Sequence, residues 1–136
     1  MRIPGLFACL VILLAACSEQ APSYPQRKPP SDFLANAANQ AAGALLFREH
    51  CSICHGDTSE GRSLRADFFQ PQARDFRDPS SRNLDPAYLY WRIETGKTVE
   101  PYLSRGSVMP AWGRHLSEEQ IWQLVAYLRM RPTGGT

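Results

Sequence analysis

The sequence predicts a small all-α domain. Three segments carry the composition, capping residues or apolar spacing of α-helices. The chain has 136 residues, which excludes a two-lobed enzyme with separate cofactor and substrate domains. Thirteen of the first 16 residues are apolar, so the rest of the chain is more polar than the overall composition indicates. Its hydrophobic core is therefore expected to be small, and the fold needs additional stabilisation from a disulfide, a metal or a cofactor.

The first predicted helix covers residues 39–51. It contains the run Gln-Ala-Ala-Gly-Ala-Leu-Leu-Phe, in which small residues around Gly43 permit the close approach of a second helix.

The middle helix is bounded by clear signals. Asp85 is suited to cap it, Pro86 to occupy its first position and Gly96 to end it. Leu89 and Ile93 are four residues apart and therefore share one face.

The last helix is predicted to begin at Ser117. Gln120, three residues later, completes a capping box, and Leu116 precedes the cap as a staple residue. The apolar positions of this helix follow a helical period: Ile121, Leu124, Val125 and Leu128.

Residues 1–16 resemble a bacterial lipoprotein signal. A basic start precedes an apolar run that is too short to span about 30 Å of hydrocarbon. The run ends in Leu-Ala-Ala before Cys17, as in a lipobox, so the resemblance implies cleavage before Cys17 and acylation of that residue, palmitate included. Ser18 then implies sorting to the outer membrane, facing the periplasm. An ordinary signal peptide is the alternative.

The rest of the chain divides into three parts. Residues 17–36 are rich in proline and predict a flexible tether with a reach of about 50 Å. Residues 37–132 form the predicted domain, and residues 133–136 are expected to be a disordered tail.

The strongest motif is the C-x-x-C-H run from Cys51 to His55. It is the attachment pattern of c-type haem, because one helical turn presents the thiols of Cys51 and Cys54 to the two vinyl groups while His55 points at the iron. A thioredoxin-like dithiol, a zinc site and a structural disulfide compete with this interpretation. A thioredoxin-like dithiol would need a βαβ unit around it, and a zinc site would need further ligands at the right spacing; the sequence shows neither. A disulfide between residues three positions apart would close too short a loop to stabilise the fold.

With this motif, residues 38–131 resemble a class I cytochrome c. Gly43 and Phe47 precede Cys51 at that family's spacing, and Tyr127 stands where the family keeps an aromatic against the glycine of the first helix. The resemblance implies three or four helices packed around one covalently bound haem c.

The resemblance also implies a sixth iron ligand. Met109 is followed by Pro110 shortly before the last helix, the family's position for the axial methionine. The other histidines of the chain are His50 and His115. His50 points about 100° away from Cys51 on a helix, and we expect His115 to be a solvated loop residue, so a bis-histidine centre is the alternative to ligation by Met109.

Five further residues are candidate contacts of the haem pocket. The family's Gly-Pro after the haem motif is absent, so Pro71 or a neighbouring carbonyl is expected to accept the second N–H of His55. Arg74 is a candidate partner for a haem propionate. The other candidates are Leu89, Ile93 and Trp112.

These features predict a monohaem electron-transfer protein rather than an enzyme. Iron with both axial positions filled by protein has no open site for a substrate, so we expect redox proteins as partners, a membrane contact through the lipid and no small-molecule substrate. The net charge of +2, without a basic block, argues against nucleic acid. One alternative is a haem enzyme or ligand sensor with a displaceable sixth ligand. Another is a structural lipoprotein whose haem only stabilises the fold.

The lipid prediction is tested by a Cys17→Ala variant. Without its acyl chains the protein should move from the detergent phase to the aqueous phase in a detergent-partition assay. A variant that still partitions into detergent would rule out anchoring at Cys17.

Overall fold

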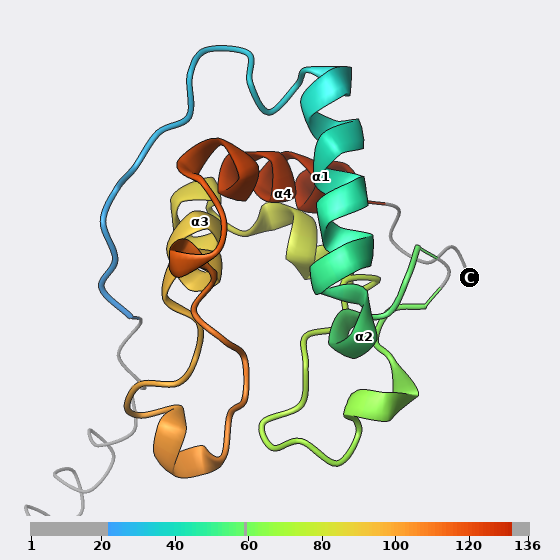
Figure 1. Cartoon of the computed structure of the whole chain (residues 1–136), viewed down its shortest axis with the longest axis vertical. Helices are drawn as coiled ribbons and strands as arrows, with labels where there is room; N and C mark the ends of the chain where they lie inside the picture. Colours follow the sequence, from blue (N-terminus) through green and yellow to red (C-terminus); the bar gives the residue numbers. More distant parts are fainter. Residues whose placement is uncertain (1–21, 59, 132–136) are drawn as a thin grey trace, which may run out of the picture.

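The computed structural model describes residues 22–58 and 60–131 of the chain. This part consists of helices and loops, and no strand occurs in it, which confirms the predicted all-α class (Figure 1). The α-helices are α1 (Ala37–His50), α2 (Ser52–His55), α3 (Pro86–Thr95) and α4 (Glu118–Met130), and the 3-10 helices are η2 (Leu64–Ala66), η3 (Pro79–Asn83), η4 (Leu103–Arg105) and η5 (Trp112–Arg114). Within the described ranges, no helix is both long and apolar enough to cross a bilayer.

The predicted helix boundaries follow from their caps. The Asp85 side chain accepts a hydrogen bond from the Ala87 N–H at 2.9 Å, with Pro86 in the first position of α3. In the capping box of α4, the Ser117 hydroxyl accepts from the Gln120 N–H at 3.2 Å, and the Gln120 side chain accepts from the Ser117 N–H at 2.8 Å. Both predicted N-termini are confirmed.

Helix α1 starts two residues earlier than the sequence predicts. The Asn36 side chain accepts hydrogen bonds from the N–H groups of Ala38 and Asn39, at 2.8 and 3.3 Å, and so caps the helix. At the other end Cys51 is the C-cap, and its N–H donates to the Phe47 carbonyl at 2.9 Å.

The helices α1 and α4 cross in close contact at Gly43 (Figure 1). A Cβ atom at Gly43 would overlap the Gln123 carbonyl and would lie 2.9 Å from the Cβ of Tyr127. The rings of Phe47 and Tyr127 pack one turn further along α1, with centroids 5.2 Å apart. The predicted pairing of this glycine with an aromatic of the last helix is therefore present.

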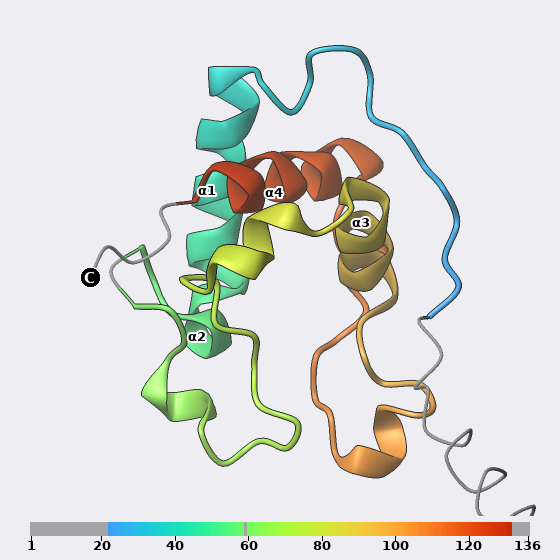
Figure 2. The same cartoon turned by 180° about the vertical axis from the view of Figure 1, so that it is seen from behind.

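Below this crossing the chain forms two long loops (Figures 1 and 2). One loop follows α2 and carries η2, and the other follows α3 and carries η4. Above them, α3 packs on α4 through the rings of Tyr90 and Trp122, whose centroids are 4.5 Å apart. The crossed helices thus lie on one side of the two loops, and the loops lie opposite each other.

Residues 22–36 lie along the domain rather than forming the predicted free tether. At one end of this segment, which we call the strap, the Tyr24 hydroxyl donates to the Asp85 carboxylate at 2.8 Å. Arg27 forms an ion pair with Glu94 at 3.2 Å. The strap is therefore held against the outer face of α3.

The other end of the strap joins the hydrophobic core. Phe33 and Leu34 pack against buried core residues, and the side chains of Asn39 and Gln40 donate to their carbonyls at 3.1 and 2.9 Å. The described part of the predicted tether, residues 22–36, therefore contacts α3 and α1 through a few aromatic and aliphatic side chains among the prolines. Residues 1–21 and 132–136, with the predicted signal, lipid site and tail, lie outside the described residues.

The close crossing predicts that a Gly43→Ala variant will be destabilised. Alanine would gain about 1 kcal/mol in helix propensity, but the overlap with Gln123 forces the helices apart at a cost of about 1–3 kcal/mol or more. Thermal unfolding of the haem-loaded protein should therefore show a lower Tm. Ala41→Leu, which adds apolar atoms to an exposed position of the same helix, is the control and should leave the Tm nearly unchanged. A Gly43→Ala variant as stable as this control would contradict the close crossing.

Candidate functional site: a haem crevice

A cavity of about 340 Å³ lies beneath the crossed helices, between the two long loops. Its walls are mainly apolar and come from every α-helix and both loops. The apolar and aromatic part of the wall includes Phe47, Phe76, Leu84, Leu89, Ile93, Trp112, Leu124 and Leu128. A cavity of this size and lining suits a large, flat, apolar group.

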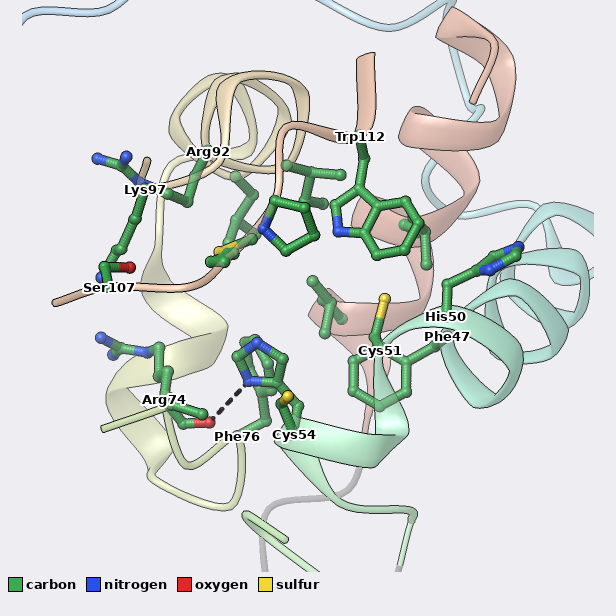
Figure 3. A pocket seen from close by; sticks show the side chains of 18 of the residues that line it. Phe47, His50, Cys51, Cys54, Arg74, Phe76, Arg92, Lys97, Ser107 and Trp112 are labelled. Atoms are coloured by element: carbon green, nitrogen blue, oxygen red, sulfur yellow. Dashed lines mark hydrogen bonds between the residues drawn. The ribbon is translucent and has the colours of Figure 1, made fainter. Parts of the chain in front are cut away.

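The C-x-x-C-H motif forms one wall of the cavity. Cys51 caps α1, Cys54 and His55 lie on the single turn of α2, and all three line the cavity (Figure 3). Both cysteines are free thiols. Burial, followed by the neighbouring Cys54, raises the pKa of the Cys51 thiol to about 12. A redox-active dithiol requires a lowered thiol pKa, so this environment disfavours the thioredoxin-like alternative.

The His55 ring is oriented by a backbone carbonyl. Its Nδ1 lies 3.2 Å from the carbonyl oxygen of Arg74, drawn as the dashed line in Figure 3. Burial lowers the pKa of His55, and the charges of Arg131 and Lys97 act in the same direction. A neutral ring with its proton on Nδ1 donates to Arg74 and leaves Nε2 available for a metal. The acceptor left open by the sequence is therefore the carbonyl of Arg74, and Pro71 contributes to the cavity wall instead.

Met109 enters the cavity on the loop that follows α3. The Lys97 N–H donates to the Met109 carbonyl at 2.9 Å, which fastens this loop to the end of α3. Gly96, at φ 62°, makes the approach possible, because a Cβ there would lie 2.6 Å from the Met109 carbonyl oxygen. Gly96 was predicted only to end the helix. It also allows the segment that carries Met109 to line the cavity.

A cluster of cations lines the side of the cavity away from Cys51 (Figure 3). It consists of Arg74, Arg92 and Lys97, and none of the ion pairs among the described residues involves them. Burial lowers the pKa of Lys97, as do the charges of Arg92 and Arg74. Three cations this close together repel one another, and an anionic group bound among them would stabilise them.

Arg92 is the buried member of this cluster, with 6% of its surface exposed. Its guanidinium donates to the Gly96 carbonyl at 2.8 Å and to the Tyr102 hydroxyl at 3.0 Å, while Nε is buried with no hydrogen-bond partner among the described residues. Neither Arg92 nor Lys97 was predicted from the sequence. The available signal was one basic residue in the last turn of α3, Arg92, and another just beyond its C-cap, Lys97, a pattern that by itself indicates a surface helix.

Arg74, the predicted partner of a haem propionate, lines the cavity and makes further contacts. Its side chain donates to the hydroxyls of Ser81 and Ser80, at 3.0 and 2.9 Å, so its charge is held at the rim by two serines. Its carbonyl, rather than its guanidinium, makes the contact with His55.

Three of the remaining predicted contacts line the cavity: Leu89, Ile93 and Trp112. His50 also lines it, with its ring centroid 5.3 Å from that of Trp112, whereas His115 is exposed and is not part of the wall. The sequence did not assign His50 to the cavity, because its place depends on where α1 ends.

Together these groups fit a c-type haem. The crevice offers two thiols, an imidazole that meets the Arg74 carbonyl, an apolar interior, and cations at the side away from Cys51. A haem carries its vinyl groups and its two carboxylates on different edges of a flat apolar ring, so the distribution of residues matches the distribution of its substituents. Arg92 would hold one of those carboxylates, since its Nε is a buried donor without a partner among the described residues.

Comparison with known proteins supports this match. Residues 38–128 match the family described as cytochrome C oxidase, cbb3-type, subunit III. Cytochrome c6 of Picosynechococcus sp. is 30% identical over 96 residues, covering 68% of this chain and 73% of that protein. The cbb3-type oxidase subunit CcoP of Cereibacter sphaeroides is also 30% identical, over 68% of this chain, but the chain spans only 28% of that subunit's length.

The fold has relatives among solved structures. The KustC0563 c-type cytochrome superposes with a TM-score of 0.52 and 22% identity, covering 66% of this chain and 96% of that one. This likeness concerns the fold, while the family match rests on sequence. The chain therefore belongs to the class I c-type cytochromes, electron-transfer proteins that bind haem c covalently.

Proposed function

We propose that this chain is a monohaem electron-transfer protein whose iron is ligated by His55 and Met109. It exchanges single electrons with redox proteins at the periplasmic face of a bacterial membrane, to which a lipid on Cys17 anchors it. One observation carries the proposal: His55 and Met109 line the same cavity as Cys51 and Cys54, His55 from helix α2 and Met109 from the loop that follows α3.

The chain's own residues prepare the site for rapid electron transfer. A bound haem supplies the one-electron chemistry. The Arg74 carbonyl orients the His55 ring, and the Lys97 N–H binds the backbone carbonyl of Met109, so one contact positions a side chain and the other positions the segment that carries Met109. Leu89 and Ile93 cover one wall with aliphatic surface and keep water away from the metal.

The cation cluster supports a single haem with two carboxylates. Arg92 and Lys97 face the side of the cavity where those carboxylates would lie, and two negative charges there would relieve the mutual repulsion of the cations. Arg74 adds a third positive charge at the rim.

The strap gives the proposed lipid anchor a defined geometry. Residues 22–36 are fixed on the domain, so the chain from Cys17 to the start of the strap spans at most about 18 Å when fully extended. The domain would therefore stay close to the bilayer. The Tyr24 ring lies 5.4 Å from that of Tyr88, a residue of the cavity wall, so the anchored end enters the domain beside the crevice.

The likeness to CcoP favours a second role, as a fixed subunit of a membrane oxidoreductase. Purification of the tagged chain from solubilised membranes separates the two roles. A stoichiometric complex supports a subunit, and recovery of the chain alone supports a free carrier.

The size of the cavity predicts that the chain cannot fold stably without its haem. Without haem the apolar side chains that line this space would be exposed to water, and exposing a fully buried side chain of this kind costs about 1.5–3 kcal/mol, against a whole domain stability of about 5–15 kcal/mol. A Cys51→Ala/Cys54→Ala variant should therefore lose its cooperative thermal transition in circular dichroism. Ile53→Ala, which changes a 62% exposed residue between the cysteines, is the control and should keep both haem and transition. A double variant that melts like the control would contradict the prediction.

The methionine ligand is tested by Met109→Ala, with Met130→Ala as the matched control because Met130 is 47% exposed at the end of α4. Loss of the thioether should abolish the weak near-red absorption band of a methionine–iron bond, lower the reduction potential and allow prompt binding of carbon monoxide to the reduced protein. Met130→Ala should behave like the parent protein. A band that survives in Met109→Ala would overturn the assignment. Prompt carbon monoxide binding by the parent would favour the ligand-sensor alternative.

A further inference from the structure

Arg131 is a buried cation at the end of α4, with 1% of its surface exposed. Its Nη2 donates to the carbonyl oxygens of Gly56 at 3.3 Å and Glu60 at 2.7 Å, and also to the carbonyl of Asp57. One side chain thus ties the last helix to the loop that directly follows the haem motif.

The guanidinium of Arg131 also faces the two aromatic rings beside the proximal histidine. Its Cζ lies 4.7 Å from the ring centroid of Phe47 and 5.7 Å from that of Phe76. The same two rings lie 6.3 and 5.0 Å from the His55 ring. Phe47 and Phe76 are therefore packed between the cation and the imidazole, where a cation–π contact on one side fixes the ring that supports His55 on the other.

The charge of Arg131 is only weakly compensated. None of the ion pairs among the described residues includes it, and its Nε and Nη1 are buried without hydrogen-bond partners there. Burial lowers its pKa, against the opposing effect of Tyr127, Asp57 and Asp75. An arginine nevertheless stays protonated in a protein, so a positive charge remains on this side of the site.

We propose that Arg131 is a positioning residue for the proximal ligand, acting on His55 through Phe47 and Phe76, and that its buried charge raises the reduction potential of the bound haem. The inference rests on the proposed haem site. Oxidised iron carries one more positive charge than reduced iron, and a cation in a medium of low dielectric disfavours the oxidised state. Lysine at this position would keep the charge, but its shorter side chain, without the planar guanidinium that lies over Phe47, would not bring a nitrogen to the position from which Nη2 binds the three carbonyls.

The test is redox titration of the purified haem-loaded protein and its variants. Arg131→Met removes the charge with little change in length, and its midpoint potential should shift downward by more than the scatter between preparations. Arg131→Lys should retain most of the parent's potential. Arg129→Met removes an exposed cation that also binds a backbone carbonyl from the last turn of α4, and it should leave the potential unchanged.

Positioning is followed by the paramagnetically shifted proton resonances of the His55 ring in the oxidised protein. These shifts should change in Arg131→Met and Arg131→Lys, which both lose carbonyl bonds, and stay as they are in Arg129→Met. An Arg131→Met protein with the parent's potential would overturn the charge claim, and unchanged shifts would overturn the positioning claim. If Arg131→Met fails to fold, Arg131→Gln decides, because it removes the charge but keeps a donor for the carbonyls: a lowered potential supports the proposal, and the parent's potential contradicts it.

These outcomes are distinct from failure of the proposed function. If the parent protein itself shows no c-type haem spectrum, the haem site is wrong. If the parent is normal and only the expected differences among the Arg131 variants are missing, the inference alone fails.

Discussion

Gly43 allows the backbones of α1 and α4 to approach so closely that a Cβ at this position would overlap the Gln123 carbonyl, and the rest of the molecule is placed from that crossing. It puts Phe47 against Tyr127 and brings the end of α1, with Cys51, to the edge of the cavity. It also directs the end of α4 toward the loop after the haem motif, where Arg131 reaches the carbonyls of Gly56 and Glu60. A wider crossing would separate the haem-attachment turn from the helix that supports it.

The crevice beneath the crossing has different chemistry on its two sides. Thiols and an imidazole line one side, and cations that form no ion pair among the described residues line the other. Without a ligand, the cations would repel one another in an apolar cavity. The apolar side chains that line the unfilled space would also lack packing contacts. One flat ligand with reactive carbons at one edge and carboxylates at another satisfies both sides, so the folding of this small chain and the loading of its cofactor depend on each other.

Local signals in the sequence were sufficient for the helices and for the motif. Asp85, Ser117 and Gln120 are caps whose hydrogen bonds involve near neighbours, and C-x-x-C-H is a contiguous pattern. Other features depend on contacts between residues far apart in the chain. Tyr24 meets Asp85 across 61 positions, and Arg131 meets Gly56 across 75. No local spacing encodes such pairs, so the strap and the buried arginine emerged only from the structure.

The central claim is that one haem is bound through Cys51 and Cys54. It is tested most directly by the intact mass of the purified protein, after expression with haem-attachment machinery, together with its spectrum in alkaline pyridine. The account predicts the mass of the processed chain, acylated if Cys17 is lipidated, plus one haem that survives denaturation, with the spectrum of a haem joined by two thioethers. A mass without haem and with two reactive thiols at Cys51 and Cys54 would contradict it.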